Sequence, residues 1–261
     1  MTAEDVHPIV VVTGGGSGIG EACAELLSRR GWRVVVADVA ADRGEEVARR
    51  IKGEFLPMDV ADVTAVTATA QRIEEDLGPV AGLVNSAGII QRPLPPEELA
   101  MEDWDHVVAV DQRGTYVACL AFGRRMADRG GGAIVNIASV AGSRSMPLHA
   151  YAPAKAAVIN MTACLAAAWG GRSVRVNSVS PGYTLTPALQ DAIDAGERDV
   201  SRLTANAALG RLVRPSEVAE ASAFLLSPAA SGITGIDLPV DAGWLAGSSW
   251  ATYGGLPDAD G

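Results

Sequence analysis

Tyr151 and Lys155 are the first residues whose types and spacing suggest chemistry. Because they are four residues apart, they lie on one face if the segment is helical. A lysine ammonium beside a phenol favours the phenolate and lowers a phenol pKa that is about 10 in water. A tyrosine changed in this way can donate or accept a proton near neutral pH. The same spacing also occurs by chance, as a surface aromatic beside a solvated lysine, so the rest of the chain has to support it.

Pro153 indicates where the helix that carries this pair begins. Proline lacks an N–H group and is tolerated only in the first turn, so we expect the helix to begin near Ala150. Tyr151 then stands at the mouth of the helix and Lys155 one turn deeper. Ser139 follows an expected strand and precedes Tyr151 by 12 residues. Its hydroxyl could bind a substrate oxygen, or it could only cap the strand end.

A glycine-rich turn stands near the beginning of the chain, in the segment Thr13-Gly-Gly-Gly-Ser-Gly-Ile-Gly20. Glycines at 14, 18 and 20 let the backbone bend tightly and approach a pyrophosphate at a helix N-terminus. A tight turn without a ligand is the alternative. The strand expected before the turn and the helix expected after it favour a nucleotide site.

Asp38 falls at the end of the second expected strand, 20 residues after Gly18. A carboxylate there can accept both adenosine ribose hydroxyls and would repel a 2′-phosphate. The positions where a phosphate-binding cation is expected hold Ser17 and Val39. The sequence therefore favours NAD over NADP, although Asp38 could also simply cap the loop.

Short β-branched segments alternate with longer helical patterns along the chain. Apolar runs such as the valines at 34–36 are typical of parallel strands that are buried on both faces. We expect strands over 9–13, 33–38, 54–58, 81–85, 133–137, 174–178 and 236–240, with helices over 18–30, 43–51, 63–77, 151–169 and 216–226 and helical patterns across 97–129. This order predicts an α/β fold: a single doubly wound Rossmann-type domain with a mostly parallel seven-stranded sheet and helices on both faces.

The chain has the composition of an ordinary globular protein, with 48% hydrophobic and 20% charged residues in 261. We expect one domain over 1–261, with a frayed lead-in over 1–8, a core over about 8–247 and a tail over 248–261. A net charge of −10 argues against nucleic acid and anionic membranes as partners. No apolar run is long enough to span a bilayer and no signal-peptide pattern opens the chain, so we expect a cytoplasmic protein.

The cysteines and histidines show no spacing typical of metal ligands or of a disulfide framework. They are Cys23, Cys119, Cys164, His7, His106 and His149. Each cysteine stands in an apolar helical pattern, so we expect buried thiols and no metal.

Six ordered segments together resemble the short-chain dehydrogenase/reductase family, in the branch with Thr-Gly-x-x-x-Gly-x-Gly and Tyr-x-x-x-Lys. The resemblance runs from about residue 8 to about residue 247. Its segments are Thr13–Gly20, Asp59-Val60, Asn85-Ser-Ala-Gly88, Ser139, the Tyr151/Lys155 pair and Pro181-Gly-Tyr-Thr-Leu-Thr186.

The resemblance implies a role for each catalytic residue. Tyr151 would exchange a proton with the substrate oxygen, while Ser139 hydrogen-bonds that oxygen and stabilises its developing charge. Lys155 would bind the nicotinamide ribose and lower the pKa of Tyr151. The hydride would pass directly between the substrate carbon and nicotinamide.

The resemblance also implies the cofactor contacts. Asp59 and Val60 would contact adenine, and the Thr184 backbone and the Thr186 hydroxyl would hold the carboxamide. The implied cofactor-binding residues are Thr13, Gly14, Ser17, Gly18, Ile19, Gly20, Asp38, Val39, Asp59, Val60, Asn85, Ala87, Gly88, Tyr151, Lys155, Pro181, Gly182, Thr184 and Thr186.

Asp111 departs from the family pattern, which usually has asparagine at this position. In the family, the backbone carbonyl of that residue holds a water that links the lysine to solvent. A carboxylate can only accept hydrogen bonds, and in its ionised form it would raise the pKa of Tyr151 or Lys155. We expect the relay to persist and the alkaline limb of the pH–rate profile to move to higher pH. Local capping by Asp111 is the alternative.

The sequence predicts an NAD-dependent oxidoreductase that transfers a hydride between a secondary alcohol, such as a polyol or sugar, and its ketone. A carrier- or CoA-linked 3-oxoacyl reductase or 3-hydroxyacyl dehydrogenase, and a non-catalytic NAD(H)-sensing protein, remain alternatives. We expect a homotetramer, and a tail that docks at a subunit interface or at the rim of the site. Candidate residues lining the substrate are Arg144, Met146, His149 and Tyr183.

Overall fold

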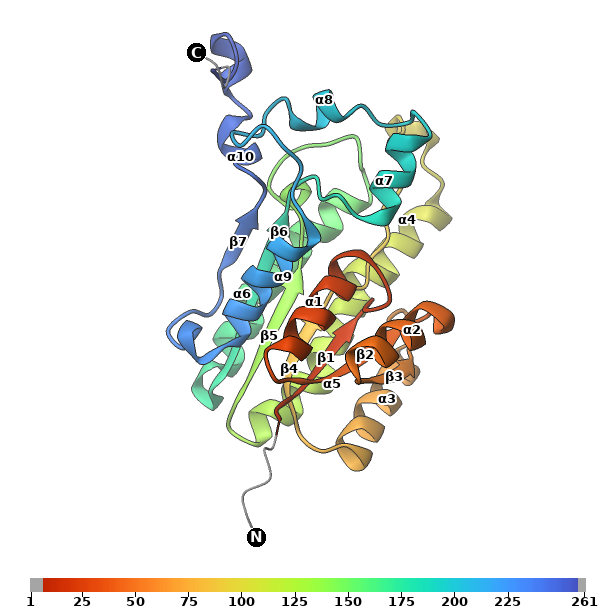
Figure 1. Cartoon of the computed structure of the whole chain (residues 1–261), viewed down its shortest axis with the longest axis vertical. Coiled ribbons are helices and arrows are strands. Elements are labelled where there is room, and N and C mark those ends of the chain that lie inside the picture. Colours follow the sequence, from red (N-terminus) through yellow and green to blue (C-terminus); the bar gives the residue numbers. More distant parts are fainter. Residues whose placement is uncertain (1–6, 258–261) are drawn as a thin grey trace.

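A seven-stranded parallel sheet forms the centre of the molecule (Figure 1). The computed structural model describes residues 7–257, so most of the expected lead-in and the end of the expected tail lie outside the described residues. The strand order is β3-β2-β1-β4-β5-β6-β7, and neighbouring strands are parallel throughout. The strands are β1 (Ile9–Thr13), β2 (Arg33–Asp38), β3 (Glu54–Pro57), β4 (Val80–Asn85), β5 (Gly132–Ile137), β6 (Val174–Pro181) and β7 (Asp237–Val240).

Helices cover both faces of the sheet, which confirms the doubly wound α/β fold (Figure 1). One face carries α1 (Gly18–Arg29), α2 (Ala41–Ile51) and α9 (Pro215–Leu226), and the other carries α3 (Val63–Asp76), α5 (Thr115–Asp128) and α6 (Tyr151–Trp169). Alternate valines of one strand face opposite layers: Val10 and Val12 pack toward α1, and Val11 toward α5. Burying each such side chain stabilises the fold by about 1.5–3 kcal/mol.

From β1 the chain builds the sheet in one direction through β2 and β3, and from β4 in the other direction through β5, β6 and β7. The segments that follow β1 and β4 therefore run in opposite directions at the carboxyl edge of the sheet. In open α/β sheets such a switch point is where ligands bind. Three short helices lie beyond this edge, in the upper part of Figure 1: α7 (Pro187–Asp194), α8 (Val200–Thr204) and α10 (Trp244–Gly247).

The segment expected to be helical over 97–129 is not one continuous α-helix. It contains a short 3-10 turn, η1 (Pro96–Glu98), then α4 (Met101–Val107), a π-helical stretch, η2 (Val108–Gly114), and α5. Further 3-10 turns are η3 (Val140–Gly142), η4 (Gly170–Arg172), η5 (Pro228–Ala230) and η6 (Trp250–Tyr253).

Strand β6 continues three residues beyond its expected end, from 178 to Pro181. Serine and proline are typical of turns, but here the hydroxyls of Ser178 and Ser180 donate to the Asp237 carboxylate of β7, at 2.7 Å and 2.9 Å. These bonds satisfy buried hydroxyls, so the strand can continue through a polar sequence.

The prediction of three buried cysteines is wrong for one of them. Cys23 and Cys119 are buried, and burial raises the pKa of each thiol to about 12. Cys164 is exposed on α6. A helix that is apolar on every side is normally buried on every side. In the single chain, however, one apolar face of α6 is uncovered.

Candidate active site

Helix α6 begins at Tyr151, with Ala150 as its cap residue, which confirms the start predicted from Pro153. The Lys155 Nζ atom lies 5.4 Å from the centre of the Tyr151 ring. Tyr151 is half-buried, whereas only 4% of the Lys155 surface is exposed. The helix therefore holds a buried ammonium behind a more accessible phenol.

The Lys155 ammonium has two partners in addition to the phenol. It donates a hydrogen bond of 3.0 Å to the carbonyl of Ile137, at the end of β5, and lies 3.1 Å from Oδ2 of Asp111. Burial acts to lower the pKa of Lys155, but the Asp111 carboxylate and Tyr151 raise it, and the pKa lies above its ordinary value. The lysine is therefore protonated over a wide pH range.

Asp111 is completely buried and lies in the π-helical stretch η2. Its Oδ1 accepts a hydrogen bond of 2.8 Å from the N–H of Ile89, and its carbonyl accepts one of 2.8 Å from the Thr115 hydroxyl. Its Oδ2 faces the Lys155 ammonium and forms an ion pair with it at 3.1 Å. Asp111 thus both caps the loop after β4 and neutralises the lysine. π-Helical turns of this kind are frequent at functional sites.

Ser139 follows β5 and begins the short turn η3. Its Oγ accepts a hydrogen bond of 3.1 Å from the N–H of Ala141, so the capping alternative is realised. A hydroxyl that accepts in this way can still donate to a substrate oxygen. At Gly142 the turn packs on α6, where a Cβ would meet the Lys155 backbone carbon at 2.8 Å.

The glycine-rich turn contacts the segment that follows β4. The Thr13 hydroxyl oxygen accepts hydrogen bonds of 3.1 Å and 3.2 Å from the N–H groups of Ser86 and Ala87. Gly14 has a φ of +64°, and a Cβ there would lie 2.7 Å from the Ala87 backbone. Only glycine satisfies both the positive φ and this close approach.

A third segment lies against the same turn. Gly18 opens α1 with a φ of +57°, and a Cβ there would lie 3.3 Å from Cγ2 of Thr186. The Ser17 side chain forms no cap with α1 among the described residues. The first N–H groups of this 12-residue helix are therefore available to an anion.

Asp38 stands beside the glycine-rich turn. Its Oδ2 accepts a hydrogen bond of 2.9 Å from the N–H of Gly16, and its Oδ1 one of 2.9 Å from that of Ala40. The capping alternative is therefore also realised, although each carboxylate oxygen has further acceptor capacity. Val39 is 69% exposed.

The remaining predicted cofactor residues line the same carboxyl edge. The Asp59 Oδ1 accepts from the N–H of Ala61 at 2.8 Å, and buried Val60 lies against Gly114. Buried Thr184 donates to the carbonyl of Gly182 at 3.0 Å, and Thr186 is the cap residue of α7. Buried Pro181 ends β6, and Gly20, which packs on Gly14, and half-buried Ile19 lie in the first turn of α1.

Sequence reasoning missed two polar residues of the site. Asn136 of β5 accepts at 2.8 Å from the Asn85 amide, and donates at 2.9 Å to the Thr162 hydroxyl of α6. An asparagine inside the apolar run at 133–137 was a usable signal for it. Gln91, in the loop after β4, binds the N-terminus of α6. Local sequence gives no sign of that contact, because the partners are 59 and 60 residues apart.

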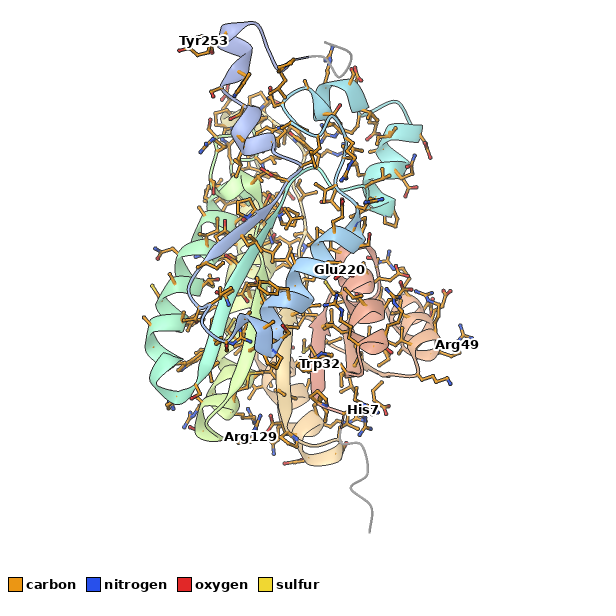
Figure 2. The ribbon with its side chains drawn as sticks, turned by 60° about the vertical axis from the view of Figure 1, so that its left-hand side comes forward. His7, Trp32, Arg49, Arg129, Glu220 and Tyr253 are labelled. Atoms are coloured by element: carbon orange, nitrogen blue, oxygen red, sulfur yellow. The ribbon has the colours of Figure 1, made fainter. Side chains whose placement is uncertain are left out.

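The candidate substrate residues differ in their surroundings. Tyr183 packs edge-on against Trp244, with ring centres 5.9 Å apart, so α10 docks beside the loop after β6. Met146 and His149 are half-buried and Arg144 is exposed. Farther along, Tyr253 is 88% exposed at the tip of the molecule (Figure 2).

A hollow of about 790 Å³ lies at the other end of the sheet, at the amino ends of the strands. Figure 2 shows His7, Trp32 and Arg129 together there, far from Tyr253. Two of its cations are paired: Arg33 with Glu54 at 3.1 Å, and Arg129 with Glu74. None of the predicted site residues lines it.

Two classes of feature are absent from the described part of the chain. No group of three or more histidine, cysteine, aspartate or glutamate residues in 7–257 is arranged to hold a metal ion. Over the same residues, no helix has the length and apolar character needed to cross a bilayer.

Comparisons with known proteins give consistent family matches. A family model described as enoyl-(acyl carrier protein) reductase matches residues 14–245. D-Threitol dehydrogenase of Mycolicibacterium smegmatis is 40% identical over 242 residues, which cover 90% of this chain and 92% of that protein. Galactitol 2-dehydrogenase of Rhizobium johnstonii is 39% identical over 241 residues, covering 90% and 93%. A solved structure described as ribose-5-phosphate isomerase from Brucella melitensis 16M is 54% identical, with a TM-score of 0.94 and coverage of 97% and 98%.

Proposed function

The chain belongs to the short-chain dehydrogenase/reductase family and is an oxidoreductase, and from this premise we propose that it oxidises a secondary hydroxyl of a small polyol with NAD. The observation that carries this proposal is the buried Lys155 ammonium beside the Tyr151 ring, at the carboxyl edge of the sheet. Two relatives named for threitol and galactitol, at 40% and 39% identity, support a polyol as the substrate class.

The glycine-rich turn fits a nicotinamide dinucleotide. Its backbone lies too close to Ala87 for any side chain at Gly14, and the open N-terminus of α1 suits a pyrophosphate. Asp38 would accept the adenosine ribose hydroxyls, and its carboxylate disfavours a 2′-phosphate. Exposed Val39 offers no cation to a 2′-phosphate. These features support NAD over NADP.

The same segments would hold the rest of the cofactor. Asp59 and Val60 would contact adenine, and the Thr184 backbone and Thr186 hydroxyl would hold the carboxamide. When bound, nicotinamide supplies the hydride acceptor.

Tyr151 would remove the proton from the substrate hydroxyl as the alcohol is oxidised. Ser139 would donate a hydrogen bond to the same oxygen and so stabilise the negative charge that develops on it. The Lys155 ammonium would bind the ribose and stabilise the phenolate.

Asp111 distinguishes this site from the usual family pattern. Its carboxylate would keep Lys155 protonated to higher pH than an asparagine would. This supports a pH–rate profile whose alkaline limb lies at higher pH. Its backbone carbonyl already accepts from Thr115 but has a second lone pair, so it can still hold a relay water.

A homotetramer is the proposed assembly. The outer face of α6 exposes Ala163, Cys164 and Ala167, and α5 exposes Tyr116 and Leu120. Apolar surface that a single chain leaves uncovered on long helices is typical of subunit contacts. Light scattering after gel filtration should give about four times 26.8 kDa; the mass of one chain would contradict the assembly.

An aldose–ketose isomerase is a second candidate, because the structure with 54% identity is described as ribose-5-phosphate isomerase. Isomerisation of a sugar phosphate transfers no net electrons to NAD. The glycine-rich turn and Asp38 favour the dehydrogenase, because aldose–ketose isomerisation needs no net hydride acceptor.

Three other activities are less well supported. Enoyl reduction, which the family model's description names, belongs to relatives that space their tyrosine and lysine more widely. A 3-oxoacyl reductase of this family usually takes NADP, which Asp38 opposes. A non-catalytic NAD(H) sensor would be expected to have lost Ser139, Tyr151 or Lys155.

Turnover assays separate these functions. The protein is incubated with NAD or NADP and a panel of tetritols, hexitols, sugars, hydroxy acids and simple secondary alcohols, while NADH or NADPH formation is followed. We expect NADH with at least one polyol. Ribose 5-phosphate converted to its ketose without NADH would favour the isomerase, and tight NADH binding without any turnover would favour the sensor.

A further inference from the structure

Gln91 joins the loop after β4 to the first residues of α6. Only 9% of its surface is exposed, and its Oε1 accepts hydrogen bonds from the backbone N–H groups of Ala150 and Tyr151, the second at 3.0 Å. A side chain from a distant loop therefore binds the backbone of the candidate proton-transfer residue itself.

Helix α6 has no other cap for these two groups. Ala150 has no side chain that could cap, Pro153 has no N–H, and the N–H of Ala152 donates to the carbonyl of Leu148 at 2.9 Å. Within residues 7–257, Gln91 is the only acceptor recorded for the N–H groups of Ala150 and Tyr151. Without it, the N–H groups of fully buried Ala150 and half-buried Tyr151 would lose this acceptor.

The loop that carries Gln91 also contacts Lys155 and its carboxylate partner. The N–H of Ile89 donates to Asp111 at 2.8 Å, and a Cβ at Gly88 would lie 3.2 Å from Asp111 Oδ2 and 3.4 Å from Lys155 Nζ. Gly88, Ile89 and Gln91 of this loop therefore lie against the ammonium, the carboxylate and the Tyr151 backbone.

We propose that Gln91 is a positioning residue for the oxidation: its Oε1 fixes the start of α6, and so the place of the Tyr151 phenol relative to Lys155. The oxygen does this work, because Nε2 is buried and donates to no described residue. Misplacing a reacting group by about 1 Å can slow a reaction about 100-fold, so a small shift of the helix start is enough to matter.

The role predicts a different result for each half of the amide. Gln91→Met has a similar length but replaces the amide oxygen with a weakly accepting sulfur, and we expect kcat to fall about 10- to 100-fold, with the Kd for NADH unchanged. Gln91→Glu keeps an acceptor oxygen and should restore most of kcat. If Gln91→Met does not fold, Gln91→Asn, whose oxygen is drawn back by one methylene, replaces it.

Asp62→Ala is the matched control. The Asp62 Oδ1 also accepts from two backbone N–H groups, of Thr64 and Ala65, but at the start of α3. We expect a similar fall in Tm, with kcat at saturating NAD unchanged. Normal kcat in Gln91→Met with only its Tm lowered would overturn the role, as would a Gln91→Glu variant as slow as Gln91→Met.

The inference rests on the proposed function, and the two fail in different ways. The assays use the alcohol that the unaltered protein oxidises. If the unaltered protein oxidises none, the proposed function fails; if it oxidises one and Gln91→Met does so equally well, only the role of Gln91 fails.

Discussion

The two ends of the parallel sheet hold their polar side chains in different ways. At the amino end, Arg33 and Arg129 surround a hollow of about 790 Å³ and are paired with carboxylates in partly exposed positions. At the carboxyl end, Asp111 and Lys155 form a buried ion pair, and Asn85 Oδ1 and Gln91 Nε2 are buried without a hydrogen-bond partner in the described residues. Buried and incompletely satisfied polar groups are costly, so they indicate function better than the size of a hollow does. The comparison predicts that substitutions at the carboxyl end change the reaction and those at the amino end only the stability.

The largest expected effect is that of Tyr151→Phe. Loss of the phenol hydroxyl removes the proton acceptor, and kcat should fall about 1,000-fold, while NADH binding, measured by fluorescence titration, is retained. Tyr253→Phe, which removes a hydroxyl from an exposed ring, is the control and should behave as the unaltered protein does. A Tyr151→Phe variant with normal kcat would contradict the prediction that substitutions at the carboxyl end change the reaction.

Asp38→Ser should have the next largest effect. It removes a charged acceptor worth about 1.5–3 kcal/mol, so kcat/KM for NAD should fall about 10- to 100-fold. Activity with NADP should rise relative to NAD, because the repulsive carboxylate is gone. Both are measured by varying the cofactor at a fixed alcohol concentration. An unchanged ratio of the two cofactors would assign Asp38 to loop capping alone.

Asp111→Asn should act on the pH profile. The carboxylate raises the pKa of Lys155 against the lowering effect of burial. Activity that needs the protonated lysine is lost as the pH rises through that pKa. Removing the carboxylate lowers the pKa, so the alkaline limb of kcat/KM should move to lower pH.

Asp128→Asn, at an exposed pair with Arg172, is the control for this profile and should leave it in place. If Asp111→Asn also leaves the alkaline limb in place, the electrostatic role of Asp111 is wrong.

The smallest effect on turnover is expected at the amino end. Arg129→Met removes the pair with Glu74 and a hydrogen bond of 2.8 Å to the carbonyl of Val80. The loss of about 1 kcal/mol should lower Tm by about 2–4 °C, as measured by calorimetry, and leave kcat within about twofold. A large fall in kcat would show that the two ends are coupled and that the contrast between them is wrong.

The fold was predictable because its signals are local. The valine runs predict β1 and β2, and Pro153 predicts the start of α6 within the first turn. The contacts of Asp111 with Ile89 and of Gln91 with α6 were not predictable, because each joins residues that are 22 to 60 positions apart in the sequence. The apolar sequence around Cys164 could not distinguish a buried face from one that another subunit would cover.

Thr186 lies between the nucleotide turn and α7, and this position bears on the order in which ligands bind. Its side chain lies against Gly18 of the nucleotide turn, and its hydroxyl oxygen accepts from the N–H of Leu189 at the start of α7. A dinucleotide bound in the turn would therefore lie beside the residue from which α7 begins. We expect a compulsory sequence in which the dinucleotide binds first and leaves last. Product-inhibition kinetics would then show NADH competing with NAD but not with the alcohol.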